Sequence, residues 1–183
     1  MRQLPRLDRK GAQVLVVDLQ ERLVPAMWDV EPVVKQARTM ILAARDLGLP
    51  VICTEQYPKG LGPTIPSIRE VLPSPPLAKM HFACGSDEAV RRALGETGRR
   101  QVIVVGVETH VCVYQSCRDL LAEGYEVHLC ADAVTSRREE HRRVALEALR
   151  DGGVLLTSVE TSIFDLLHVA GTPEFKKVSA YMK

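Results

Sequence analysis

Three side chains that can do covalent or acid–base chemistry stand at or just beyond expected strand ends: Asp18, Lys79 and Cys112. A thiol is a nucleophile, a carboxylate accepts and returns protons, and an ammonium stabilises a nearby anion. Together they form a set suited to nucleophilic attack on an acyl carbon. Singly, each has a plainer interpretation: Cys112 as a small buried side chain, Asp18 as a turn residue or helix cap, and Lys79 as a solvated surface cation.

Cys112 is the most informative of the three because of its place on an expected helix at about His110 to Glu123. Helical spacing puts four apolar residues on the core-facing stripe: Val113, Cys117, Leu120 and Leu121. Cys112 falls outside this stripe, on a line with Ser116 and Asp119. Backbone N–H groups of that first turn are predicted to lower the thiol pKa and, with the turn 107–109, to bind an oxyanion.

The elements that must position these residues alternate between apolar strands and amphipathic helices. Strands are expected at 13–19, 50–54, 77–80, 101–107, 126–131 and 154–157. Helices are expected from Pro32 to Leu47, from Ser86 to Leu94, after Ser136, and at 158–167, with a terminal helix or partner-docking arm at 172–183. This alternation predicts one domain over 1–183, an α/β fold in which a mostly parallel, about six-stranded Rossmann-like sheet forms a three-layer α/β/α sandwich. Ligands bind such sheets at the carboxyl ends of the strands.

Local signals refine this arrangement. Ser86 with Asp87 and Glu88 is predicted to cap one helix, and Ser136 with Glu139 has the spacing of a capping box for another. The buried stripe that follows comprises Val144, Ala145, Ala148 and Leu149. Residues 55–76 carry six prolines and two glycines, which predicts a long loop that acts as a lid over the site.

Composition excludes several classes of function. The chain of 183 residues has 24 Lys+Arg against 23 Asp+Glu and only 4% aromatic residues, which disfavours nucleic acid and anionic membranes as partners. The sequence lacks an apolar run of about 20 residues and an apolar leader, so a cytoplasmic location is expected. Five cysteines without a CxxC pair predict free thiols rather than a disulfide framework or a zinc cluster.

Three segments carry a resemblance to a known family: LVVDLQERLVP at 15–25, AKMHFACG at 78–85, and VVGVETHVCVYQSCRDLLAEGYEVHLCADAVTSR at 104–137. The sequence resembles the isochorismatase-like cysteine hydrolases, which include nicotinamidases and N-carbamoylsarcosine amidohydrolases, over nearly its whole length. The signature GVETHVCV and the segment TEQYPKGLG are most similar to the isochorismatase domain-containing proteins, many of which lack an assigned substrate.

The resemblance implies roles for individual residues. Cys112 would be the nucleophile of a catalytic triad, Asp18 its proton shuttle, and Lys79 the cation that holds the carboxylate and supports the thiolate. The backbone N–H groups of Glu108 and Cys112 would form the oxyanion hole, beside a cis peptide between Val107 and Glu108.

Departures from the family pattern bear on metals. Metal-dependent nicotinamidases carry a DxHxxxH pattern where this chain reads Glu55, Gln56, Tyr57 and Pro58, and no histidine precedes His81. We therefore expect no catalytic metal and no cofactor. Isochorismatases proper lack the nucleophilic cysteine, whereas this chain has it, which favours covalent acyl transfer.

The leading hypothesis is hydrolysis of a small carboxamide or related acyl compound through a thioester on Cys112. Six residues are candidates to line the substrate pocket: Gln20, Trp28, Glu55, Tyr57, Leu61 and Tyr114. Two alternatives stay open, namely a catalytically idle binding or scaffold protein and a redox sensor that pairs Cys112 with Cys117. The family's habit of assembling, with a tail FKKVSAYMK of no evident intramolecular role, also predicts a homo-oligomer, either a dimer or a larger ring.

Overall fold

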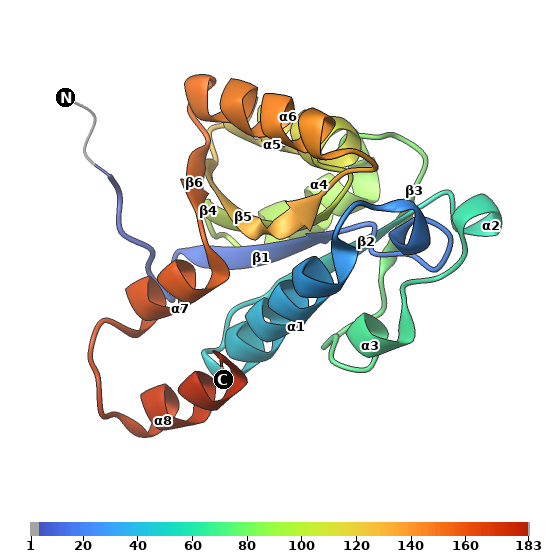
Figure 1. Ribbon diagram of the computed structural model, residues 1–183. Helices are drawn as coiled ribbons and strands as arrows, with labels where there is room; N and C mark the ends of the chain where they lie inside the picture. The colour runs from blue at the N-terminus through green and yellow to red at the C-terminus, as the bar shows by residue number, and fades with distance from the viewer. Residues whose placement is uncertain (1–3, 183) are drawn as a thin grey trace.

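A computed structural model describes residues 4–182, which form a six-stranded parallel sheet with helices on both faces (Figure 1). The strands are β1 (Ala12–Val17), β2 (Val51–Gln56), β3 (Leu77–Lys79), β4 (Gln101–Val107), β5 (Glu126–Thr135) and β6 (Leu155–Thr157). They lie in the order β3-β2-β1-β4-β5-β6, and each neighbouring pair is parallel. The predicted three-layer α/β/α sandwich is confirmed.

Helices form the two outer layers. They are α1 (Val30–Asp46), α2 (Pro58–Leu61), α3 (Pro66–Arg69), α4 (Glu88–Glu96), α5 (Tyr114–Ala122), α6 (Glu139–Asp151), α7 (Val159–Leu167) and α8 (Pro173–Ser179). Helices α1, α7 and α8 cover one face of the sheet, and α4, α5 and α6 cover the other (Figure 1). Within residues 4–182, none of the helices combines the length and apolarity needed to cross a membrane.

The central strand β1 supplies both apolar layers because its side chains alternate between the faces. Val14 and Val16 pack with α1, whereas Leu15 and Val17 pack with α4 and α5. All six residues of β1 are buried, as the continuous apolar run predicts for a strand covered on both faces. Asp18, the next residue, therefore stands at the carboxyl end of the most buried part of the sheet.

Of the two predicted helix caps, the first is right in part and the second is wrong. The side chain of Asp87, not Ser86, accepts the N–H groups of Ala89 and Val90 at the start of α4. Helix α6 begins after Arg138, which has no capping side chain. Ser136 stands too far before that helix to cap it, and its hydroxyl contacts the Nδ1 atom of His110 at 3.0 Å.

The predicted buried stripe of α6 is half right. Ala145 and Leu149 are buried, but Val144 is 53% exposed and Ala148 is exposed. The spacing of apolar residues identifies the apolar side of a helix but not how far its packing partner extends. Val144 and Ala148 lie at the edge of that side, beyond the reach of the sheet.

The predicted long loop at 55–76 is shorter and more ordered than expected. Glu55 and Gln56 belong to β2, and the rest contains α2 and α3. Ile68 is fully buried, and the guanidinium of Arg45 on α1 donates to the carbonyl of Val71 at 3.1 Å. The segment is thus packed against α1 along part of its length.

The C-terminal tail has an intramolecular role, contrary to the sequence-based expectation. Val178 of α8 is buried in the core that α1 shares with the sheet. Lys177 and Tyr181 both donate to the Asp46 carboxylate at the end of α1, each at 2.6 Å. The alternative of a terminal helix is therefore the one that the structure supports.

Gly106 lets β4 approach β1 closely at the carboxyl ends of the two strands. Its φ is +122°, and a Cβ atom there would lie 2.1 Å from the carbonyl oxygen of Val17. Such a distance is far inside van der Waals contact, and the backbone conformation suits only glycine. The close approach brings the ends of β1 and β4 together.

We expect Gly106→Ala to lower the free energy of unfolding by at least about 3 kcal/mol, because the methyl group meets backbone and φ must change. Urea denaturation followed by circular dichroism measures it. Gly95→Ala is the matched control, since its Cβ would meet nothing within 4 Å. That helical change should raise stability by up to about 1 kcal/mol. Similar effects of the two variants would contradict the prediction.

Candidate functional site

A buried ion pair joins two strand ends that are not adjacent in the sheet. Lys79 closes β3 and Asp18 follows β1, with β2 between them. The Nζ atom of Lys79 lies 2.8 Å from Oδ2 of Asp18, and both side chains have no solvent exposure. Asp18 adopts a φ of +50°, the left-handed region that an aspartate tolerates better than most residues. The sequence-predicted carboxylate and ammonium are thus in direct contact.

Strand β2 supplies the polar groups that make this burial tolerable. The hydroxyl of Thr54 donates to Oδ1 of Asp18 at 2.7 Å, and Nζ of Lys79 donates to Oε1 of Gln56 at 2.7 Å. Sequence reasoning missed both residues. The available signal was the pair of polar residues, two apart, at the carboxyl end of an otherwise apolar strand, which places them on one face.

The ammonium of Lys79 also donates to the carbonyls of His81 and Phe82, at 3.3 and 3.2 Å. Its three hydrogens therefore face four acceptors. Burial alone would lower the pKa of Lys79, but the charge of the Asp18 carboxylate opposes this and the net pKa is raised. Lys79 accordingly stays charged at neutral pH despite its burial.

Cys112 reaches the same region from the opposite half of the sheet. It lies in a π-helical turn, η2 (Thr109–Val113), between β4 and α5. Of the predicted row of Cys112, Ser116 and Asp119, the last two face the turn after β3: Ser116 accepts the N–H of Cys84 at 2.9 Å, and Asp119 accepts from Ser86 at 2.8 Å. Cys112 is only 5% exposed and belongs to the same buried cluster as Val113 and Cys117, so the expectation that it lies outside the core is wrong. The π-helical turn departs from the α-helical spacing on which that expectation was based.

The expectation of a lowered thiol pKa is wrong. Burial raises the pKa of Cys112, and the Asp18 carboxylate raises it further by its charge and by hydrogen bonding. The Lys79 ammonium acts in the opposite direction but does not prevail. The two charges largely offset one another, and desolvation then favours the neutral thiol. The resting site thus holds a protonated thiol near a carboxylate.

The turn that precedes Cys112 has a distinctive backbone. The peptide bond between Val107 and Glu108 is cis, and the carbonyl of Glu108 accepts the N–H groups of Val111 and Val113. The Glu108 carboxylate lies 2.9 Å from the guanidinium of Arg137, which follows β5. Glu108 is thus fixed by contacts on both its backbone and its side chain.

Two of the predicted pocket residues are occupied by structural contacts. The amide of Gln20 accepts the N–H of Gln56 at 2.7 Å and donates to the carbonyls of Gln56 and Gly62. The Glu55 carboxylate accepts both the N–H and the hydroxyl of Thr64, at 2.6 and 2.7 Å. Both side chains tie the segment after β2 to the sheet.

The other four pocket candidates lie in three places, because Tyr57 and Leu61 stand at the two ends of α2. Tyr57 is 48% exposed, and its N–H donates to the carbonyl of Lys79, which puts its backbone beside the ion pair. Leu61 is half-buried on α2. Trp28 is 39% exposed and is tied through its backbone to Thr135. Tyr114 lies in a hollow of about 310 Å³ between α5 and α6.

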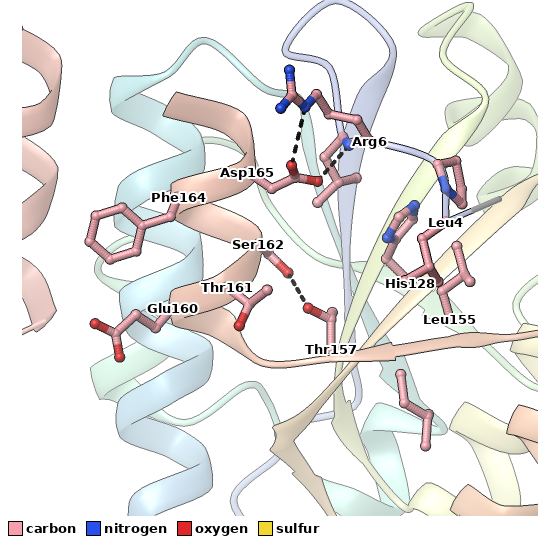
Figure 2. A pocket seen from close by; sticks show the side chains of 13 residues that line it. Leu4, Arg6, His128, Leu155, Thr157, Glu160, Thr161, Ser162, Phe164 and Asp165 are labelled. Carbon is pink, nitrogen blue, oxygen red and sulfur yellow. Dashed lines mark hydrogen bonds and ion pairs between the residues drawn. The ribbon is translucent and has the colours of Figure 1, made fainter. Parts of the chain in front are cut away.

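A larger cavity, of about 790 Å³, is unrelated to this chemistry. Figure 2 shows it between α7, the edge strand β6 and the N-terminal segment, with Asp165 paired to Arg6 and Ser162 to Thr157. Asp18, Lys79 and Cys112 are not among its lining residues. Across residues 4–182, no group of three or more His, Cys, Asp or Glu side chains is arranged to hold a metal ion.

We expect Lys79→Met to lower the free energy of unfolding by about 3–5 kcal/mol, because it leaves the Asp18 charge buried without its cation. The folded pKa of Lys79 is raised, so its contribution is fully present at neutral pH and is lost only as pH rises through that folded value. The double variant Asp18→Asn/Lys79→Met removes both charges and should recover much of the loss. Urea denaturation at pH 7 compares them, and equal destabilisation of the two would contradict the prediction.

Comparison with known proteins agrees with this geometry. The family model "Isochorismatase domain" matches residues 12–161. The isochorismatase domain-containing protein 2 of Danio rerio is 41% identical over 94% of this chain and 87% of its own. The solved structure titled MAR1 ribonuclease from Caenorhabditis elegans is 36% identical, with a TM-score of 0.92 over 97% of this chain and 92% of its own. The YcaC protein of Escherichia coli, titled an octameric hydrolase of unknown specificity, is 26% identical, with a TM-score of 0.92 over 99% and 92%. The chain therefore belongs to the isochorismatase family and has the fold of its hydrolases.

Proposed function

We propose that the protein is a cysteine-dependent hydrolase that cleaves a small carboxamide or related acyl compound through a thioester on Cys112. The observation that carries this proposal is the burial of a thiol among the charges of Asp18 and Lys79, which both act on its pKa. A nucleophile, a proton acceptor and a fixed cation then share one enclosed site. Structural burial alone does not require that a thiol be placed beside two charges.

In the first half of the reaction the Asp18 carboxylate removes the proton of Cys112 as its sulfur attacks the acyl carbon. This order follows from the raised pKa of the thiol, because a preformed thiolate is disfavoured in the resting site. The backbone N–H groups of Glu108 and Cys112 stabilise the oxyanion that forms. When the tetrahedral intermediate collapses, the C–N bond breaks and the amine leaves with the proton from Asp18.

In the second half, Asp18 accepts a proton from water, whose oxygen attacks the thioester carbon. The C–S bond then breaks, the sulfur regains a proton from Asp18, and the carboxylic acid leaves. The sum is one amide and one water converted to one acid and one amine. Lys79 transfers no proton in this scheme, and it fixes the carboxylate and offsets negative charge throughout.

Burial and charge support a small substrate over a nucleic acid. Cys112 is only 5% exposed, so a compact group can reach its sulfur more easily than a folded polymer can. The formal net charge is +1, which provides little general attraction for phosphate backbones. The Caenorhabditis elegans neighbour is nevertheless described as a ribonuclease, so RNA is included in the substrate screen.

Cys112→Ala is expected to abolish turnover and thioester trapping, because it removes the sulfur that takes up the acyl group. Carboxamides, carbamoyl compounds, pyrazinamide-like rings, isochorismate and an RNA oligonucleotide are tested in parallel, with mass spectrometry of the intact protein for the adduct. Cys117→Ala, a buried thiol on the same helix, is the control and should keep activity. Turnover by Cys112→Ala would overturn the covalent mechanism, and uniform inactivity of the wild type would favour the idle scaffold.

We also propose that the protein self-associates through the α5–α6 face, defined by Tyr114, Val144 and Ala148. This face carries apolar side chains that the single chain leaves open, and it surrounds a hollow of about 310 Å³. Apolar surface of this kind is characteristic of association sites. The octameric state given for the Escherichia coli neighbour supports assembly in this family member as well.

Light scattering of the wild type should give a mass that is a multiple of 20.3 kDa. Val144→Glu places a charge on the α5–α6 face and is expected to reduce that mass. Val169→Glu is the matched control, because Val169 is 62% exposed and lies away from this face. A wild-type mass of 20.3 kDa, or an unchanged assembly in Val144→Glu, would contradict this proposal.

A further inference from the structure

The turn that follows β3 holds the ammonium of Lys79, and its first residues have little packing of their own. Its carbonyls at His81 and Phe82 accept from Nζ of Lys79. Met80 is 65% and Phe82 is 53% exposed, whereas Ala83 and Cys84 at the end of the turn are buried. Apolar burial thus holds only the end of the turn, and hydrogen bonds hold it at both ends.

Two hydrogen bonds fix those ends. At the start, the side-chain amide of Gln56 donates to the carbonyl of Met80 at 2.9 Å. At the finish, the N–H of Cys84 donates to the hydroxyl oxygen of Ser116 at 2.9 Å, and neither Cys84 nor Ser116 is exposed. The first anchor comes from the strand beside Lys79, and the second comes from helix α5.

Ser116 stands four residues after Cys112, about one helical turn further along the same row. The hydrogen bond from Cys84 to Ser116 thus connects the backbone that cradles Lys79 with the helical segment that carries the thiol. Cys84 also lies against the ion pair, because its sulfur is 4.0 Å from the Thr54 hydroxyl that donates to Asp18. A second contact joins the same region to α5, from the Ser86 hydroxyl to the Asp119 carboxylate at 2.8 Å, but it is exposed.

We propose that Ser116 is a positioning residue, whose hydroxyl holds the turn that cradles Lys79 against the helix that carries Cys112. This inference rests on the proposed function. It adds a fourth residue, on which the position of Lys79 relative to Cys112 depends. Without the Ser116 hydroxyl, the buried N–H of Cys84 loses its acceptor, and the turn is held against α5 less firmly. Lys79 then keeps Asp18 but sits less precisely relative to the sulfur.

The test uses iodoacetamide as the probe, with the rate of Cys112 alkylation measured by peptide mass spectrometry across pH. Ser116→Ala should slow alkylation about tenfold or more at a given pH, and its pH profile should move upward. The reason is that Lys79 is the group that lowers the pKa of Cys112. Ser116→Thr keeps a hydroxyl and should restore most of the rate.

Ser162→Ala is the matched control, because Ser162 is an equally buried helical serine that donates to the carbonyl of Ser158 on the other side of the sheet. Any general loss of stability should appear in both variants as a lower melting temperature, without a changed pH profile in Ser162→Ala. If Ser116→Ala alkylates at the wild-type rate or faster, the positioning role is refuted. The proposed function then stands or falls separately, on whether Cys112→Ala retains turnover.

Discussion

The buried ion pair between Lys79 and Asp18 is the constraint on which the site depends. Removing two full charges from water carries a cost of several kcal/mol for each ion, and attraction offsets it only when the remaining hydrogen-bonding capacity is met. Here Thr54 satisfies the second carboxylate oxygen, and Gln56 with two backbone carbonyls surrounds the ammonium. The ends of β1, β2 and β3 are therefore bound together by one polar cluster beneath the reactive sulfur.

The topology explains why the thiol comes from the other half of the chain. Strands β1, β2 and β3 extend the sheet in one direction, and β4, β5 and β6 extend it in the other. The connections diverge between β1 and β4, and parallel sheets bind ligands at the carboxyl ends of strands where such a divergence occurs. Asp18 follows the first of these strands and Cys112 follows the second. Gly106 permits the close contact between the two strands.

The charge balance of the site determines the protonation state of the Cys112 sulfur in the resting protein. One carboxylate and one ammonium act on Cys112 in opposite directions, so desolvation decides and the thiol stays protonated. A neutral thiol near a carboxylate is compatible with burial, because the thiol carries no charge that must be desolvated. The proposed chemistry therefore moves one proton between Cys112 and Asp18 instead of maintaining a permanent thiolate.

The sequence by itself determined the alternation of strands and helices and the types of the reactive residues at the strand ends. Strand β4 was predicted with its observed bounds, because a β-branched run flanked by polar residues defines a buried strand. The placement of Ser116 and Asp119 on one side of α5 likewise follows from helical periodicity. Local pattern suffices in these cases because the information lies within one element.

Only the tertiary structure decided what each row faces and how the charges balance. Gln56 and Ser116 are ordinary polar residues in the sequence, and they matter because a turn distant in the chain folds between them. The raised pKa of Cys112 depends on burial and on two charges from other strands, whereas helical position alone predicted a lowered one. Val144 and Ala148 look like core residues by spacing, but the extent of the opposing surface leaves them open. Desolvation and long-range contact belong to the assembled fold, so a local sequence pattern does not contain them.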